Sequence, residues 1–341
     1  MHNVARTAVV LMNLGGPDRL ESVQPFLFNL FSDPAILRLP ALLRLPLARI
    51  IAWRRGPVAQ EIYRKLGGGS PLLANTEAQA RALEAVLGQQ HRCFVAMRYW
   101  HPTSEQTARE VADWAADEVV CLPLYPQFST TTTASSLAAW CGSAKRRGIE
   151  CPTRVVCCYP TDPGFVEAIA GLIRPALDTA AGHERPPRLL LTAHGLPKRI
   201  VQAGDPYPNQ VETTAGAVIG ALNRPGLDWT ACYQSRVGPL EWIGPETDNE
   251  IRRAGKDRVP VVVAPISFVS EHSETLVELD VDYRDLAVAS GVPAYHRVPT
   301  VGIEPGFIRS LAALVRRASA EDRIGGCASD SARCALPGLA A

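Results

Sequence analysis

The chain has 341 residues, of which 47% are hydrophobic and 20% are charged, and its formal net charge is +1. A chain of this length and composition can bury a large core, and we expect it to divide into two domains. The near-neutral charge gives no overall attraction to nucleic acid, so no nucleic-acid partner is expected.

Nine cysteines occur at irregular spacing, several of them within apolar segments, which fits reduced core thiols better than a disulfide framework and predicts a cytoplasmic protein. No apolar stretch is long enough to span a bilayer. The first apolar run, residues 8–14, is too short for the apolar region of a secretory signal and is followed by Gly15-Gly16-Pro17. We therefore expect this run to form a first buried strand.

Residues 26–55 combine bulky apolar side chains with five arginines and a single acidic residue, Asp33. The prolines Pro34, Pro40 and Pro46 predict that the segment is divided into short helical pieces. Such a segment can cover a core, form the lip of an apolar ligand pocket or rest on an anionic membrane surface. We favour the pocket lip, and we expect peripheral contact with the inner face of the cell membrane as an additional property.

The chain contains two similar halves. Residues 9–17 align without a gap with residues 189–197, and two further strand ends follow in the same order in each half. Apolar segments alternate with helix-period segments such as 76–87 and 210–222, which predicts an α/β fold with a parallel, doubly wound sheet in each half. A generic parallel-sheet pattern is the alternative explanation of these matches.

The halves define the expected domains. An N-terminal domain at residues 1–155 includes the pocket-lip segment, and a C-terminal domain follows at residues 156–318. Residues 319–341 are rich in Ala, Ser and Gly, and we expect them to form a flexible tail.

Two apolar strands of the second half lead to histidine. Residues 188–194 stop at His194, and the strand at residues 261–265 leads to His272. In open α/β sheets ligands bind beyond the carboxyl ends of the strands, where both imidazoles would project.

Three glutamates accompany His272 at positions i, i+3 and i+7 of a predicted helix: Glu271, Glu274 and Glu278. Such a stripe is either a solvated helix start, favoured by the helix dipole, or a path for a cation. The two strand-end imidazoles favour the second interpretation and place a metal site in the C-terminal domain.

A run of hydroxyl side chains, which includes Ser129 and Thr130, follows Tyr125 at another strand end. Hydroxyls at a helix N-terminus can hold a ligand carboxylate, although ordinary capping accounts for most of the pattern.

Five motifs occur in one order and resemble those of the ferrochelatase family: Gly67-Gly68-Gly69-Ser70-Pro71, Leu124-Tyr125-Pro126-Gln127, His194-Gly195-Leu196-Pro197, Val237-Gly238-Pro239-Leu240-Glu241-Trp242 and Ser270-Glu271-His272-Ser273-Glu274-Thr275-Leu276. The resemblance covers roughly residues 7–315. It implies an enzyme that inserts ferrous iron into protoporphyrin IX, the terminal step of haem biosynthesis. It also implies two similar Rossmann-like domains, with parallel sheets flanked by helices and a cleft between the domains.

The resemblance assigns roles to matching residues. His194 and Glu274 match the pair that binds the metal or accepts the pyrrole protons, and the division of these two roles is open. Glu278 and Glu271 would feed iron inward, and His272 would orient the site. Arg98 would face a porphyrin propionate, and core packing explains Tyr99 equally well. The residues at positions of the porphyrin pocket are Leu14, Arg98, Tyr99, Tyr125, Ser129, Thr130 and Trp242.

No cofactor is expected beyond the ferrous iron substrate. Some members of the family hold a two-iron cluster with three tail cysteines and one internal cysteine, whereas this tail offers only Cys327 and Cys334, so we expect no cluster. Two alternatives to the main interpretation are a chelatase for coproporphyrin or another tetrapyrrole, and a non-catalytic haem or metal carrier. A carrier would have no need for carboxylates opposite a strand-end imidazole.

Overall fold

The structure, a computed structural model, describes residues 5–320. They divide into two compact units, one formed by the residues up to Tyr159 together with residues 308–320, the other by Pro160–Phe307. The boundary expected from the sequence, 155/156, lies four residues earlier, and the sequence pattern assigns residues 308–318 to the second half. These last residues form most of helix α11 (Pro305–Ala320), where Ser319 donates a hydrogen bond to Glu118 of the first unit.

The first unit is built on a parallel sheet with the strand order β2-β1-β3-β4. Its strands are β1 (Thr7–Asn13), β2 (His91–Met97), β3 (Glu118–Pro123) and β4 (Thr153–Val155). All seven residues of β1 are buried, as expected for a central parallel strand covered on both faces. The register places Val10 beside Phe94 of β2 and Cys121 of β3.

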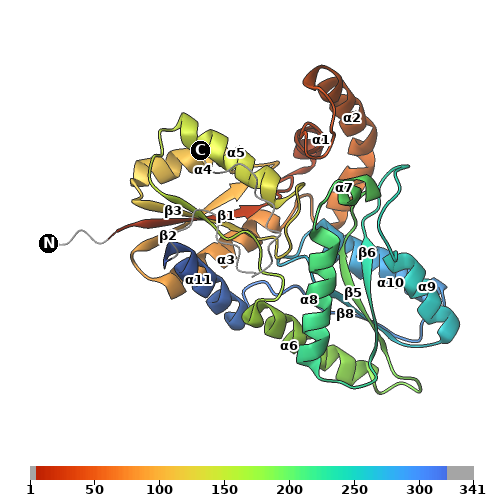
Figure 1. Cartoon of the computed structure of the whole chain (residues 1–341). Helices are drawn as coiled ribbons and strands as arrows, with labels where there is room; N and C mark the ends of the chain where they lie inside the picture. Colours follow the sequence, from red (N-terminus) through yellow and green to blue (C-terminus); the bar gives the residue numbers. More distant parts are fainter. Residues whose placement is uncertain (1–4, 321–341) are drawn as a thin grey trace. The chain divides into compact units, whose positions relative to one another are not determined.

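Helices cover both faces of this sheet: α3 (Leu72–Leu87), α4 (Ser104–Trp114), α5 (Thr133–Arg146) and α11 (Figure 1). Helices α4 and α5 pack Val111 and Trp140 against alternate residues of β1, among them Val10. A capping box of Thr103 and Gln106 begins α4 and satisfies free backbone groups at its first turn.

The second unit repeats this arrangement with the strand order β6-β5-β7-β8. Its parallel strands are β5 (Arg188–His194), β6 (Asp228–Gln234), β7 (Val261–Pro265) and β8 (Tyr295–Arg297). Because the order matches that of the first sheet strand for strand, the predicted fold of two similar α/β halves with parallel sheets is confirmed.

The helices of the second unit also lie on both faces of their sheet (Figure 1). They are α6 (Pro163–Ala180), α7 (Lys198–Gln202), α8 (Tyr207–Leu222), α9 (Thr247–Asp257), a π-helix (Glu274–Asp282) and α10 (Tyr283–Ala289). Ile251 of α9 and Leu279 of the π-helix share a core cluster with Leu190 of β5. This packing holds the π-helix against the central strand.

The pocket-lip segment differs from the prediction of short helical pieces. Helix α1 (Val23–Phe31) is followed by a single helix of 25 residues, α2 (Ala41–Lys65), which contains Pro46 and Pro57. Pro46 lies in the second turn of α2, so its missing N–H removes only the bond to the carbonyl of Leu42, and the helix continues through it.

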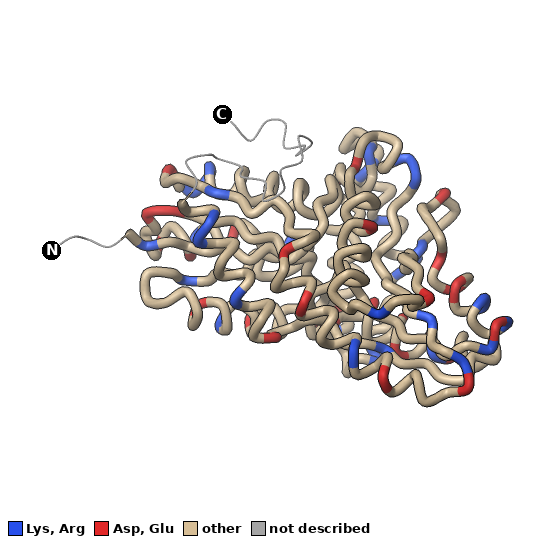
Figure 2. The backbone as a smooth tube through the Cα atoms, turned by 60° about the horizontal axis from the view of Figure 1, so that its bottom comes forward, with Lys and Arg blue, Asp and Glu red and all other residues tan. Residues whose placement is uncertain are grey.

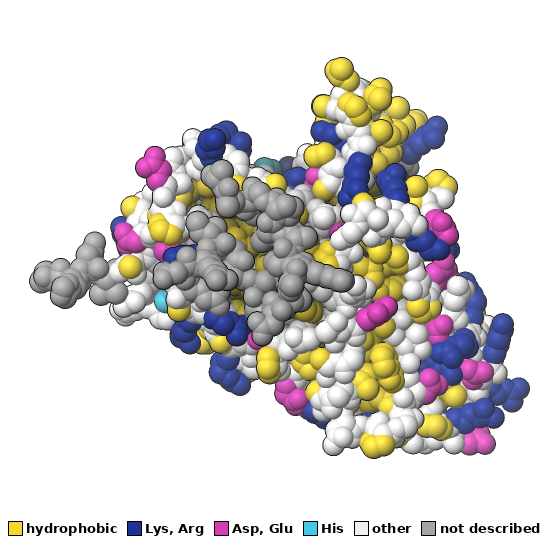
Figure 3. Space-filling model, in the orientation of Figure 1, with side chains coloured by type: hydrophobic (Ala, Val, Ile, Leu, Met, Phe, Trp, Pro, Cys, Tyr) yellow, Lys and Arg dark blue, Asp and Glu magenta, His cyan; other side chains and the backbone are white. Residues whose placement is uncertain are grey.

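Helix α2 exposes an unusual number of large apolar side chains together with arginines. The side chain of Leu42 is 89% exposed and that of Trp53 is 66% exposed. Figure 3 shows these apolar and basic side chains gathered on the projecting helix, whereas Figure 2 shows acidic and basic residues interspersed over the rest of the backbone. Within residues 5–320, none of the helices is both long and apolar enough to cross a membrane.

Candidate functional site

The candidate site of the second unit begins at His194, the last residue of β5. Its ring Nδ1 lies 2.6 Å from the carbonyl oxygen of Gly195. Because a carbonyl only accepts hydrogen bonds, Nδ1 carries the proton in this contact, and Nε2 of the neutral ring keeps its lone pair. Nε2 lies 3.6 Å from Glu274 Oε1. The imidazole can therefore take up a proton or hold a metal beside a carboxylate.

The turn after His194 leaves little space for a side chain larger than that of glycine. A Cβ atom at Gly195 would lie 3.1 Å from the carbonyl oxygen of Gln234 and 3.2 Å from the ring of Trp242. The Gly195 N–H donates to that same carbonyl of Gln234. Trp242 is fixed in turn by its indole N–H, which donates to the carbonyl of Val237, and its ring centroid lies 6.4 Å from that of His194. The close packing therefore orients His194 and places Trp242 beside it.

Glu274 lies between two imidazoles at the first residue of the π-helix. Its Oε2 is 3.6 Å from Nε2 of His272, and its Oε1 faces His194. Burial raises the pKa of Glu274, but the two neighbouring imidazoles outweigh burial and lower its pKa to about 2. Burial lowers the pKa of His272, whereas Glu274 raises it, and the net shift is upward. The carboxylate is therefore ionised at neutral pH and available as an anionic ligand.

Glu278 follows one turn later and is enclosed by hydrogen-bond donors from Ser235 and Tyr283. The helix that carries it is a π-helix, in which the N–H of Tyr283 bonds to the carbonyl of Glu278 five residues earlier. Single π-turns are rare and occur often at functional sites. Burial, followed by the charge of Glu274, raises the pKa of Glu278.

Glu271 does not share this helix. It precedes the π-helix, and its carboxylate accepts hydrogen bonds from the guanidinium of Arg297 at 2.5 Å and from the backbone N–H of Thr300 at 2.9 Å. The predicted α-helical stripe at i, i+3 and i+7 therefore differs from the structure, because the helix begins only at Glu274 and Arg297 of β8 holds the preceding glutamate. The role of Glu271 in iron transfer stays a prediction.

In the first unit, Arg98 and Tyr99 meet at Asp33, a buried carboxylate. Arg98 Nη2 and the Tyr99 hydroxyl each donate to Asp33 Oδ2 at 2.7 Å. The hydroxyl of Ser135 donates to the same oxygen, and Arg98 Nε donates to Ser135. Tyr99 is only 2% exposed, and Leu14 packs in the same cluster. The Arg98 side chain remains 21% exposed, and its ligand role stays a prediction, whereas the ring of Tyr99 belongs to the core of this unit.

The remaining residues of the first unit lie where β3 leads to α5. The Tyr125 hydroxyl is 3.5 Å from Ser136 Oγ. Ser129 is buried and its hydroxyl pairs with that of Thr131 at 2.8 Å, whereas Thr130 is half-buried. The N-cap residue of α5, Thr132, makes no side-chain capping hydrogen bond, so the ordinary capping that the sequence favoured differs from the structure, and the ligand role of Ser129 and Thr130 stays a prediction.

Two points of the cofactor prediction concern metals. Among residues 5–320, no group of three or more His, Cys, Asp or Glu side chains is arranged to hold a metal ion. Cys327 and Cys334, on which the prediction about the two-iron cluster depends, lie outside the described residues.

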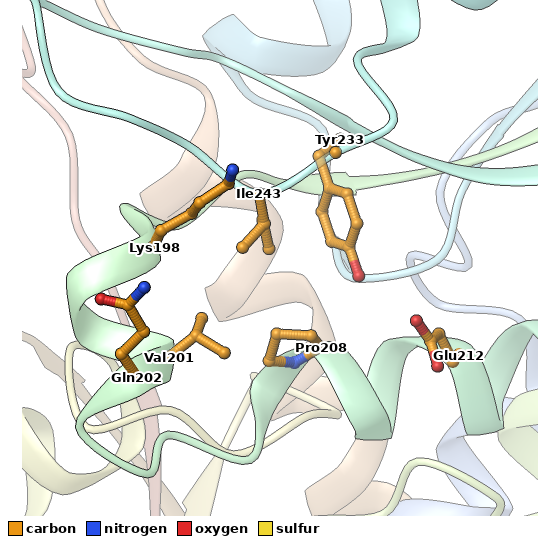
Figure 4. A pocket seen from close by; sticks show the side chains of 8 residues that line it. Lys198, Val201, Gln202, Pro208, Glu212, Tyr233 and Ile243 are labelled. Atoms are coloured by element: carbon orange, nitrogen blue, oxygen red, sulfur yellow. The ribbon is translucent and has the colours of Figure 1, made fainter.

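A pocket of about 350 Å³ lies between α7, α8 and the loop of Ile243 in the second unit (Figure 4). In Figure 4 the Tyr233 hydroxyl and the Glu212 carboxylate point toward one another, and Val201 and Pro208 add apolar surface. His194 and Glu274 do not line this pocket. The imidazole and carboxylate pair is therefore a separate site.

Sequence reasoning did not identify Asp33 as the partner of Arg98, or Gln234, Ser235 and Tyr283 as partners of Glu278. Of these residues, the sequence pattern marks only Asp33, because it is the one acidic residue among the arginines of residues 26–55.

Comparisons with known proteins show which sequences and structures the chain resembles. A family model described as Ferrochelatase matches residues 6–319. A ferrochelatase of Caulobacter vibrioides is 56% identical over 316 residues, which are 91% of this chain and 90% of that protein. A ferrochelatase of Pelagibacter ubique is 45% identical, over 91% of this chain and 90% of that protein. Among solved structures, SirB from Bacillus subtilis with Fe3+ has a similar fold, with a TM-score of 0.58 at 12% identity, over 92% of this chain and 96% of that chain.

Proposed function

Since the chain belongs to the ferrochelatase family, an enzyme family that inserts ferrous iron into protoporphyrin IX to form haem, we propose that His194 and Glu274 are the centre of this reaction. The observation that carries the proposal is the 3.6 Å separation of an imidazole Nε2 and an ionised carboxylate contributed by a strand end and a π-helix. Both residues lie in the second unit.

The chemistry needs a proton acceptor and an anion. Porphyrin loses two N–H protons when it gains a dication, so a base must approach the pyrrole nitrogens. His194 suits this task because Nδ1 is committed to the Gly195 carbonyl and Nε2 is left to accept a proton. Glu274 stabilises the imidazolium that forms, and its negative charge attracts the iron.

The ligand types also suit a metal that has to be released to the macrocycle. Imidazole binds ferrous iron well, and a carboxylate supplies charge, while thiolates would hold the metal more tightly. The predicted positions of Leu14, Arg98, Tyr125 and Trp242 in the porphyrin pocket are part of the same proposal. Bending the flat macrocycle would expose a pyrrole lone pair to the metal, and binding energy has to supply that strain.

The experiment that tests the function is anaerobic incubation of the full chain with ferrous iron and either protoporphyrin IX or coproporphyrin. We expect the absorbance change of metallation with protoporphyrin IX. Faster metallation of coproporphyrin would favour the alternative chelatase, and porphyrin binding without metallation of either compound would favour a carrier.

We also propose that α2 gives the protein reversible contact with anionic lipid. The exposed Leu42 and Trp53 side chains can enter the interface while the arginines of the helix approach lipid phosphates. In vesicle flotation at low salt, the protein should rise with vesicles of phosphatidylglycerol and phosphatidylcholine and should rise less at high salt. The absence of flotation at low salt would remove this proposal, and vesicles of phosphatidylcholine alone are the control for charge.

A further inference from the structure

The carboxylate of Glu278 is surrounded by four hydrogen-bond donors. Its Oε1 accepts from the backbone N–H of Ser235 at 2.7 Å and from the hydroxyl of Tyr283 at 3.1 Å. Its Oε2 accepts from the hydroxyl of Ser235 at 2.5 Å and from Nε2 of Gln234 at 3.1 Å. An ionised carboxylate offers about four lone-pair positions. Two donors on each oxygen therefore leave this group no free position for a metal.

Gln234 connects this carboxylate to both members of the proposed reaction centre. It ends β6 opposite His194 in the sheet register, and its backbone carbonyl accepts from the N–H of Gly195. Its side-chain Nε2 donates to Glu278 and, at 3.0 Å, to the backbone carbonyl of Glu274. One residue thus holds the strand end that carries the imidazole and the first turn of the helix that carries the carboxylate.

Ser235 adopts a backbone conformation that serves this contact. Its φ of +63° lies in the left-handed region, which residues other than glycine rarely occupy unless the surroundings fix them. In this conformation its N–H and its hydroxyl reach both oxygens of Glu278. The two hydrogen bonds account for a serine at a position where glycine would be less strained.

We propose that Gln234 and Ser235 are positioning residues that set the distance between His194 and Glu274, and that Glu278 is the buried anchor they hold rather than an iron ligand. The proposal rests on the function assigned to His194 and Glu274. It differs from the sequence-based expectation that Glu278 feeds iron inward, because all its acceptor positions are already used.

The test compares kcat and the KM for ferrous iron at saturating protoporphyrin IX in three variants: Ser235→Gly, Tyr283→Phe and Glu278→Gln. Ser235→Gly removes the hydroxyl but keeps the N–H donor and permits the positive φ, and Tyr283→Phe removes one donor. We expect each variant to lower kcat, by about tenfold for Ser235→Gly, with the KM for iron unchanged. Anaerobic calorimetry should likewise show that each variant binds ferrous iron with the affinity of the wild type.

Tyr295→Phe is the matched control for Tyr283→Phe. The Tyr295 hydroxyl also bonds to the π-helix, but to the backbone carbonyl of Leu279 at 2.7 Å and not to Glu278. We expect Tyr295→Phe to keep the kcat of the wild type. An equal loss in both tyrosine variants would show a general effect on the helix and would overturn the positioning role.

Two further outcomes would overturn the proposal. The first is a raised KM and a weakened iron affinity in Glu278→Gln at unchanged kcat, which would make Glu278 an iron ligand. The second is wild-type kcat in Ser235→Gly and Tyr283→Phe. If Glu278→Gln does not fold, these two variants still decide the question. Failure of the wild type to insert iron would instead contradict the proposed function itself.

Discussion

Replacing His194 with alanine is expected to lower kcat for iron insertion by about 100- to 10 000-fold, the range that a positioned acid or base contributes, while porphyrin binding is largely kept. The imidazole ends β5, and its Nε2 lies 3.6 Å from the Glu274 carboxylate while its Nδ1 is bonded to the Gly195 carbonyl. Alanine removes the proposed proton acceptor but leaves the Gly195 turn and Trp242 in place. Anaerobic turnover and a porphyrin fluorescence titration measure the two properties separately.

His183→Ala is the control for this experiment. His183 lies in the same unit but is exposed on the segment after α6, away from the strand end. Its replacement should leave turnover unchanged, which separates the loss of a particular imidazole from a general effect of removing histidine. If His194→Ala turned over at the same rate as the wild type, another group would have to accept the pyrrole protons.

The fold could be predicted from sequence because its signals are local. Central parallel strands such as β1 and β5 are buried on both faces, so they appear as continuous apolar runs that end at Gly or Pro turns. The repeat of that pattern predicted two similar sheets, and the shared strand order confirms it. The prediction that residues 26–55 form short helical pieces was wrong at Pro46, because one missing hydrogen bond near a helix start does not outweigh the rest of a 25-residue helix.

The site was only partly predictable. His194 and His272 could be identified because strand ends place their side chains at one edge of a parallel sheet. The pairing of His194 with Glu274 came from the resemblance to ferrochelatases. The geometry of the π-helix could not be predicted, since its glutamates have a spacing that also fits an α-helix.

The donors around Glu278 were missed for a different reason. Gln234 and Ser235 lie 44 and 43 residues from Glu278 in sequence, and they meet it only through the pairing of β6 with β5 and the packing of the π-helix against β5. Contacts that depend on tertiary register leave no periodic pattern in the chain.

Replacing Glu274 with glutamine should also reduce kcat by about 100-fold or more, because the variant keeps the shape of the side chain and loses only its charge. In the proposed centre the charge attracts the ferrous ion and stabilises the protonated form of His194, so iron affinity should fall together with turnover. Anaerobic calorimetry with ferrous iron measures the affinity, and the turnover assay measures kcat. The control is Glu304→Gln, which changes an exposed glutamate of the same unit.

Glu274→Gln is also expected to change how the stability of the fold depends on pH. In the folded chain the pKa of Glu274 is about 2, against an ordinary value of 4.5, so the ionised carboxylate stabilises the fold above pH 4.5 and this contribution is lost as the pH falls toward 2. The difference between these two pKa values corresponds to about 3 kcal/mol at most. Urea unfolding at pH 4.5 and pH 3 should therefore show a smaller loss of stability on acidification in Glu274→Gln than in the wild type, because this window lies between the two pKa values. Equal losses would mean that the carboxylate is not held between the two imidazoles, and the electrostatic basis of the proposed centre would fail with it.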